Sequence, residues 1–264
     1  MGLHGRGRTM AKKPNWVIDK ERARKAETVW LFGLHAVRDA LLNPARVKLR
    51  LVVTKNAADR LGDALNKGGI TPEIADPRKF PAPLDPGSVH QGAALEVKPL
   101  DWGPLADIAV QGGVILCLDR VTDPHNVGAI LRSAEVFGAS AVIAPLRHAA
   151  PETGALAKTA SGALERQPYL RVKNLATSME ELRKMGYRLI GLDGTAEQTL
   201  EEALPSNGAV ALVLGAEGPG LRDKTKETCD ILAKIAFSGE FGSLNVSNAA
   251  AVALYATNAT MKKA

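Results

Sequence analysis

Polar residues suited to a binding site occur at three places in the chain, and each place follows an apolar run. They are Asn126 and Arg132, then Glu217, and last Ser243 and Asn245. Amide and hydroxyl groups position a ligand, and a carboxylate can accept a proton. A guanidinium stays protonated and can stabilise negative charge. These residue types therefore favour a polar ligand-binding site.

The first polar stretch is expected at the turn between a strand and a helix. Residues 114–118 form a continuous apolar run, which suits a strand buried on both faces. Asp123 is a good helix N-cap, and Pro124 suits the first helical position. Apolar residues then recur at helical spacing, at Val127, Ile130, Leu131 and Ala134. Ligands bind at the carboxyl ends of parallel strands, so residues 119–126 are the first candidate site.

Two later loops have the same setting. Residues 215–220 read Gly-Ala-Glu-Gly-Pro-Gly after an apolar strand, and glycine lets backbone amides approach a ligand closely. A dinucleotide loop is disfavoured because Glu217 stands where its second glycine must be. In residues 238–248, Ser243 and Asn245 can also cap the final helix. All three loops follow strands, so in a parallel sheet they converge on one pocket.

Strands and helices are expected to alternate through the second half of the chain. The expected strands are residues 114–118, 141–144, 188–192, 209–214 and 231–237. Alternation of this kind predicts an α/β fold with a mostly parallel sheet and helices on both faces. The expected organisation has four parts: a basic disordered tail at 1–27, a small α/β domain at 28–97, a linker at 98–112 and a larger domain at 113–264.

Composition supports a globular protein of 264 residues, with 45% hydrophobic and 23% charged residues. Residues 1–25 contain eight Lys or Arg and two acidic residues, which accounts for the whole net charge of +6. Such a tail either binds RNA phosphates or only adds solubility. Cys117 and Cys229 form no disulfide or zinc framework and indicate reduced thiols in the cytoplasm. No apolar run approaches membrane-spanning length, and no metal site is expected.

Three motifs resemble those of the SpoU family, the S-adenosylmethionine-dependent RNA ribose 2′-O-methyltransferases of the SPOUT class. They are N-V-G-A-I-L-R at 126–132, L-G-A-E-G-P-G-L at 214–221 and S-L-N-V-S-N-A-A at 243–250. The resemblance covers residues 113–255. The preceding domain, with F-G-L-H-A-V at 32–37 and H-Q-G at 90–92, is similar to the RNA-binding domain of the subgroup that methylates a guanosine in 23S ribosomal RNA.

The resemblance implies a C-terminal trefoil knot, a homodimer and bound S-adenosylmethionine. The implied catalytic residues are Asn126, Arg132, Glu217, Ser243 and Asn245. The implied cofactor-binding residues are Leu214, Gly215, Ala216, Gly218, Ile235, Ala236, Leu244 and Asn245. His35 and Arg132 are the implied RNA-binding residues. The chain departs from the family at 235–237, where Ile-Ala-Phe replaces Ile-Pro-Met, and at Asn248, where a smaller apolar residue is common.

Several roles remain open. An arginine side chain stays protonated and so cannot act as the base. Arg132 therefore either stabilises the developing alkoxide or binds the adjacent phosphate. Glu217 either accepts a proton or orients Arg132, or it is a solvent-exposed loop carboxylate. His35 is either an RNA contact or a half-buried helix residue. The favoured function is methylation of 23S rRNA; the alternatives are tRNA 2′-O-methylation and non-catalytic RNA binding in ribosome assembly.

Overall fold

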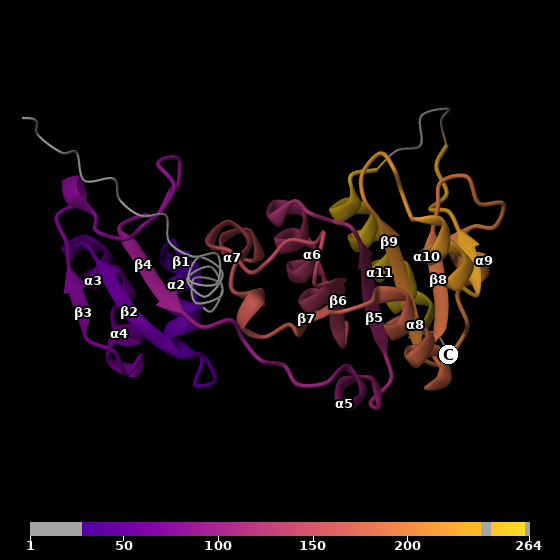
Figure 1. The fold of residues 1–264 in the computed structure, drawn as a ribbon, viewed down its shortest axis with the longest axis horizontal. Coiled ribbons are helices and arrows are strands. Elements are labelled where there is room, and N and C mark those ends of the chain that lie inside the picture. Colours follow the sequence, from indigo (N-terminus) through magenta and orange to yellow (C-terminus); the bar gives the residue numbers. More distant parts are fainter. Residues whose placement is uncertain (1–27, 239–243, 262–264) are drawn as a thin grey trace, which may run out of the picture.

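The computed structural model describes residues 28–238 and 244–261, which form two sheets side by side (Figure 1). The predicted tail and the predicted site residue Ser243 lie outside these ranges. Within the ranges, no helix combines the length and the apolar character needed to cross a membrane. The same ranges contain no group of three or more His, Cys, Asp or Glu side chains placed to hold a metal ion.

The C-terminal sheet has six strands in the order β10-β8-β9-β5-β6-β7, and every neighbouring pair is parallel. The strands are β5 (Val114–Asp119), β6 (Ala141–Pro145), β7 (Tyr169–Val172), β8 (Arg188–Leu192), β9 (Val210–Gly215) and β10 (Ile231–Ala233). The predicted parallel α/β sheet is therefore confirmed. The strand expected at 231–237 ends early, at Ala233, and the short strand β7 was not expected.

Helices cover both faces of this sheet. They are α5 (Leu105–Ala109), α6 (Pro124–Phe137), α7 (Gly154–Ala160), α8 (Leu175–Lys184), α9 (Leu200–Ala203), α10 (Asp223–Thr228) and α11 (Val246–Met261). Alternate residues of β5 enter different buried clusters. Ile115 and Cys117 belong to the cluster that contains α5 and α8 residues, and Leu116 and Leu118 to the one that contains α6 and α11 residues. Period-two alternation thus places helices on both sides of β5.

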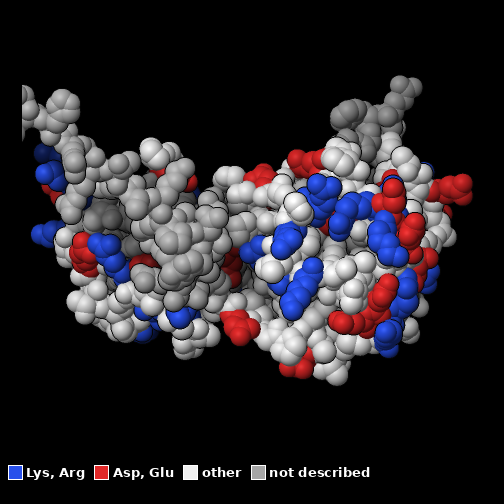
Figure 2. Space-filling view, in the orientation of Figure 1, with Lys and Arg blue, Asp and Glu red and all other residues white. Residues whose placement is uncertain are grey.

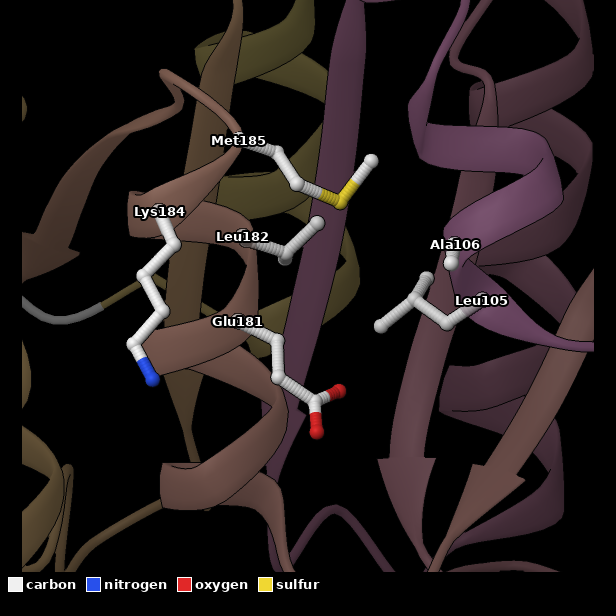
Figure 3. Close-up of a pocket in the computed structure, with 6 residues that line it drawn as sticks. All are labelled: Leu105, Ala106, Glu181, Leu182, Lys184 and Met185. Atoms are coloured by element: carbon white, nitrogen blue, oxygen red, sulfur yellow. The ribbon is translucent and has the colours of Figure 1, made fainter.

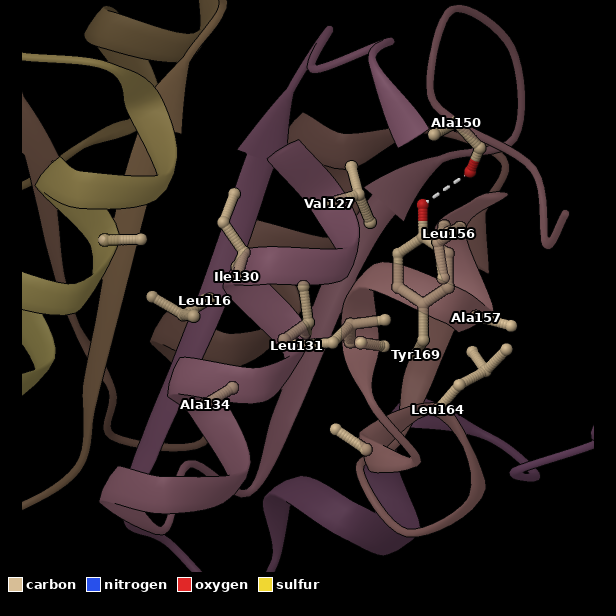
Figure 4. Packing of buried hydrophobic residues seen from close by; sticks show 14 of the residues in the cluster. Leu116, Val127, Ile130, Leu131, Ala134, Ala150, Leu156, Ala157, Leu164 and Tyr169 are labelled. Atoms are coloured by element: carbon tan, nitrogen blue, oxygen red, sulfur yellow. Dashed lines mark hydrogen bonds between the residues drawn. The ribbon is translucent and has the colours of Figure 1, made fainter. Parts of the chain in front are cut away.

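Helix α6 begins and ends as the sequence predicts. The Asp123 side chain accepts a hydrogen bond from His125 N at 2.9 Å, and Gly138 ends the helix in the left-handed region. The apolar face of the helix packs over Leu116 of β5 (Figure 4). Gly128 allows α7 to approach, because a Cβ there would lie 2.6 Å from Leu156 O. The motif glycine therefore serves helix packing.

The N-terminal sheet has the order β1-β4-β2-β3. Its strands are β1 (Val29–Phe32), β2 (Lys48–Val53), β3 (Pro72–Ile74) and β4 (Ala93–Val97), with helices α2 (Leu34–Leu42), α3 (Lys55–Leu61) and α4 (Asp63–Lys67). Strand β4 is antiparallel to β1 and β2, whereas β3 is parallel to β2. We call this sheet and its helices the N-terminal lobe, and the six-stranded sheet with its helices the C-terminal lobe.

The two lobes share one buried apolar cluster. Helix α7 begins directly against β1, where a Cβ on Gly154 would lie 2.3 Å from the Phe32 ring. Residues 98–112, predicted to link the two domains, contain the helix α5 and are themselves bonded to the C-terminal lobe, since Leu100 N donates to Glu152 Oε1 at 3.3 Å. The connecting segment is therefore part of the contact between the lobes.

A buried ionic network crosses the same contact. Arg46, only 3% exposed, donates to the Glu165 carboxylate at 2.8 and 3.0 Å and to Glu152 Oε2 at 3.1 Å. A third partner is the carbonyl of Lys98, at 2.8 Å. Burial raises the pKa of Glu152, and the neighbouring Arg46 opposes that rise. Arg46 comes from the N-terminal lobe and both carboxylates come from the C-terminal lobe. The network therefore fixes the orientation of one lobe relative to the other.

Candidate functional site

Three of the predicted catalytic residues meet at the carboxyl edge of the C-terminal sheet. Asn126 Nδ2 donates to Glu217 Oε1 at 3.2 Å. Asn245 Nδ2 donates to Asn126 Oδ1 at 3.0 Å and also to Glu217 Oε1. Asn245 lies 119 positions from Asn126 and 28 positions from Glu217 along the chain, so only the folded sheet brings the three together. We call Asn126, Glu217 and Asn245 the polar trio.

Glu217 is exposed but is not a free loop carboxylate. Its Oε1 also accepts a hydrogen bond from Val246 N, at 3.2 Å, in the first turn of α11. A carboxylate at a helix N-terminus is favoured by the helix dipole. Asn245 caps the same helix, because its Oδ1 accepts from Ser247 N at 2.9 Å and from Ser247 Oγ at 2.6 Å. The trio is thus anchored to the start of α11. Asn245 both caps this helix and takes part in the trio.

A cavity of about 990 Å³ opens beside the trio. It is bounded by the loops that follow β8, β9 and β10 and by the start of α11. All the predicted cofactor-binding residues line it: Leu214, Gly215, Ala216, Gly218, Ile235, Ala236, Leu244 and Asn245. Its volume is at the upper end of the range for small-molecule sites. Their role as cofactor ligands remains a prediction.

The loop after β9 folds tightly back on itself. Gly220 N donates to Ala216 O at 2.9 Å, and Gly218 and Gly220 have φ angles of 79° and 70°. A Cβ on Gly215 would lie 2.1 Å from the carbonyl carbon of Gly220. Glycine at 215 is therefore required for the loop to close.

Replacing Gly215 with alanine should open this loop and weaken binding of S-adenosylmethionine by about 5- to 150-fold, because overpacking of this kind costs about 1–3 kcal/mol. Gly87→Ala is the matched control, since a Cβ on Gly87 meets nothing within 4 Å. Calorimetric titration of both variants measures the difference. Equal affinities would show that the loop plays no part in cofactor binding.

Three polar side chains that line the cavity were not predicted from the sequence. Asp193 and Thr195 follow β8, and Lys226 lies on α10. Hydrogen bonds from Lys226 and Thr195 lower the pKa of Asp193 to about 2. The available signal was the run Asp-Gly-Thr directly after the apolar strand at 188–192, which places a fourth polar loop at the same edge of the sheet.

Asp119, at the start of the first candidate stretch, has a structural role. It is fully buried at the end of β5. Its carboxylate accepts hydrogen bonds from Arg222 Nε at 2.8 Å, from Arg222 N at 3.1 Å and from Thr225 Oγ1 at 2.7 Å. These bonds tie β5 to the start of α10, so Asp119 supports the site rather than lining the cavity.

Arg132 does not line the cavity and forms no hydrogen bond with the trio. Its side chain is exposed on α6 and forms no hydrogen bond or ion pair with any residue that the structure describes. His35 is also exposed, in the first turn of α2, so the half-buried alternative is wrong. The two N-terminal motifs do meet, because Leu34 N donates to Gln91 Oε1 at 3.1 Å.

A second, smaller hollow of about 230 Å³ lies between α5 and α8 (Figure 3). Leu105, Leu182 and Met185 make its walls largely apolar, with Glu181 and Lys184 also beside it. Neither charged side chain forms an ion pair among the described residues. The arrangement lacks the convergent polar groups that mark the cavity beside the trio.

Comparisons with known proteins agree with this geometry. Residues 113–255 match the SpoU rRNA Methylase family, and residues 30–102 match the domain described as RNA 2'-O ribose methyltransferase substrate binding. The 23S rRNA (guanosine-2'-O-)-methyltransferase RlmB of Vibrio vulnificus is 40% identical over 235 residues, covering 86% of this chain and 94% of that protein. Its Escherichia coli K12 counterpart is 38% identical, covering 85% and 96%.

The fold is shared with a solved structure. The SpoU methyltransferase AviRb from Streptomyces viridochromogenes, crystallised with the cofactor AdoMet, superposes with a TM-score of 0.77. The match covers 91% of this chain and 92% of that one at 22% identity. The polar trio and the loop after β9 lie within the first match, on the motifs that first suggested the family. The chain belongs to the SpoU rRNA methylase family.

Proposed function

We propose that this protein transfers a methyl group from S-adenosylmethionine to the ribose 2′-hydroxyl of a guanosine in 23S rRNA. The observation that carries the proposal is the polar trio on the rim of the 990 Å³ cavity. The two relatives described above are matched along 94% and 96% of their own length, so the correspondence includes the N-terminal lobe.

The cavity has features that fit the cofactor. Its floor is the tight loop at 215–220, where glycine leaves the backbone uncovered, and apolar side chains of Leu214, Leu244 and Val246 also line it. Backbone groups suit the polar edges of a nucleoside, and apolar side chains suit its flat faces. S-adenosylmethionine bound here supplies the methyl group. Asp193 and Lys226, which form an ion pair with each other, also line the cavity.

The trio acts on the ribose hydroxyl of the RNA substrate. Oε1 of Glu217 accepts three hydrogen bonds, and no residue that the structure describes donates to Oε2. Glu217 can therefore accept the ribose hydroxyl proton through Oε2 while the two asparagines hold the carboxylate in place. In-line transfer requires close placement of the reacting atoms, which an anchored carboxylate favours. Arg132 stabilises the developing alkoxide or the adjacent phosphate.

We infer that the protein forms a homodimer in which Arg132 of one copy completes the active site of the other. Exposed apolar side chains lie on the two helices beside it, with Val136 on α6 at 70% exposure and Tyr255 on α11 at 64%. Val252, 41% exposed on α11, also lines the cavity. This patch is continuous with the site, so a second copy on it would place its own Arg132 near the cavity.

The trefoil knot and the cytoplasmic location belong to the same proposal. Helix α11 packs against α6, α9 and β9, and Lys234 N donates to Gln198 O at 2.9 Å, so the chain after β10 passes beside the loop after β8. That arrangement supports a threaded C-terminal segment. Cys117 is buried and Cys229 half-buried as free thiols, as a reducing compartment allows.

The test is methyl transfer to RNA from a strain that lacks the protein. Purified protein, radiolabelled S-adenosylmethionine and total RNA should give 2′-O-methylguanosine in 23S rRNA, mapped by nuclease digestion. Gly215→Ala serves as the low-activity control. Label found in tRNA would change the substrate, and no label in any RNA would favour a non-catalytic role.

A further inference from the structure

Four basic side chains follow one another along the carboxyl edge of β5, β6 and β7. They are Arg120, Arg147, Arg171 and Lys173, which we call the basic strip. The strands β6 and β7 are paired up to Pro145 and Val172, and Leu146 N donates to Val172 O at 2.7 Å. The loop after β6 then returns to the loop after β5, where Ala150 N donates to Val121 O at 3.2 Å. Arg120, Arg147 and Lys173 therefore lie on neighbouring loops, and Arg171 lies within β7.

The position of the strip is informative. Strand β7 is the edge of the C-terminal sheet nearest the N-terminal lobe, and β5 leads directly into α6 and the polar trio (Figure 1). The strip thus spans the surface between the lobe that matches a substrate-binding domain and the candidate catalytic residues. Figure 2 shows basic side chains over the region of β6 and β7, and basic and acidic side chains interleaved farther toward α9 and α10.

Three acidic side chains on the same edge of the sheet already have partners within the protein. Asp119 binds Arg222, Asp123 caps α6 and Glu152 binds Arg46. Arg120, Arg147 and Lys173 are exposed and form no ion pair among the described residues. Arg171 holds the loop after β6 through a bond from Nη2 to Leu146 O. The charges of Arg120, Arg147 and Lys173 therefore face solvent, whereas Arg171 is half-buried.

The backbone at Arg120 adds an independent observation. Arg120 has a φ of 62°, in the left-handed region that glycine and asparagine adopt most readily. His148, next to Arg147, has the same φ of 62°. Residues in such backbone conformations cluster at functional sites. Backbone geometry alone would favour glycine at 120, so the arginine here motivates a functional hypothesis.

We propose that the basic strip binds phosphates of the 23S rRNA strand and guides it from the N-terminal lobe to the polar trio. This inference rests on the proposed function and names the surface that holds its substrate. Lys and Arg bind RNA phosphates largely through charge and release of counterions. Phosphate contacts position the strand without reading its sequence.

Arg120→Gly provides the sharper of two tests, because it removes charge and backbone strain together. The variant should unfold at the same or a higher temperature than the wild type, yet bind unmodified 23S rRNA transcript more weakly. The slope of log affinity against log salt concentration should fall by about 1, as expected for one lost phosphate contact. Arg120→Lys, which keeps the charge, should restore the slope. A purely structural role for Arg120 would leave the slope unchanged.

The second test compares opposite edges of the sheet. Arg147→Gln with Lys173→Gln should lower the salt slope by about 2. Lys184→Gln with Arg188→Gln, two exposed residues at the amino edge of β8, is the matched control and should leave it unchanged. Equal salt slopes for the two double variants, or an altered oligomeric state in place of altered RNA binding, would overturn the proposal that the basic strip binds RNA. Failure of the wild-type protein to methylate rRNA would instead overturn the proposed function.

Discussion

Arg132→Ala should lower kcat for methyl transfer by about 10²–10³-fold, the effect typical of removing a donor that stabilises developing negative charge. Affinity for S-adenosylmethionine should stay within a few fold, because Arg132 does not line the cavity. Single-turnover rates at saturating RNA and calorimetric titration of the cofactor measure the two quantities. Arg132→Lys should recover only part of the rate, since lysine keeps the charge but loses the planar fork.

The source of Arg132 can be tested with the same variant. If Arg132 completes the site of a second copy, co-expression of Arg132→Ala with Gly215→Ala should restore activity. Half of the dimers would then be mixed, and each mixed dimer would have one intact site, which gives about a quarter of the wild-type rate. Neither variant alone should reach that value. An inactive mixture would place Arg132 in the site of its own chain, and full activity of Arg132→Ala would remove it from catalysis.

Local signals predicted the C-terminal sheet well because its strands are long apolar runs separated by capped helices. Asp123, Pro124 and Gly138 mark the ends of α6 by local hydrogen bonding and backbone conformation, and such signals depend on few neighbours. Strand β7 was missed because it has only four residues, of which Arg171 and Val172 are partly exposed. Its pairing with β6 comes from tertiary contacts, which a local pattern does not contain.

The candidate site was partly predictable for the same reason. Loops that follow parallel strands must lie at one edge, so the meeting of Asn126, Glu217 and Asn245 follows from topology. The hydrogen bonds that hold Glu217 to the start of α11 depend on side-chain geometry and were not predictable. The loop at Asp193 was missed because only one acidic residue and a threonine mark it. Arg132 was expected within the site; within one chain it does not line the cavity, and its catalytic role stays a prediction.

The ionic network between the lobes had no sequence signal, because its members lie 106 and 119 positions apart. Its function follows from burial. Arg46 binds two carboxylates that are 4% and 7% exposed, so loss of the guanidinium leaves both without their cation. Removing one partner of a buried ion pair costs about 3–5 kcal/mol, more than the pair itself contributes relative to an apolar contact.

Arg46→Met should therefore lower the free energy of unfolding by about 3–5 kcal/mol. Arg50→Met is the matched control four residues farther along, in β2, because the Arg50–Glu73 pair is 43% and 47% exposed, and it should cost less than about 1 kcal/mol. Urea-induced unfolding followed by circular dichroism measures both. Equal losses in the two variants would show that the network does not join the lobes.

The loss in Arg46→Met should also depend on pH. Burial already raises the pKa of Glu152, and removing Arg46 takes away the charge that opposes the rise. A carboxyl group with a higher pKa in the folded state binds its proton more tightly when folded, so stability falls as pH rises from the unfolded pKa through the folded one. The variant should thus be closest to the wild type near pH 5 and farthest from it near pH 8. A loss that is independent of pH would mean that the two carboxylates find solvent or another cation once Arg46 is gone, and that the lobes separate there.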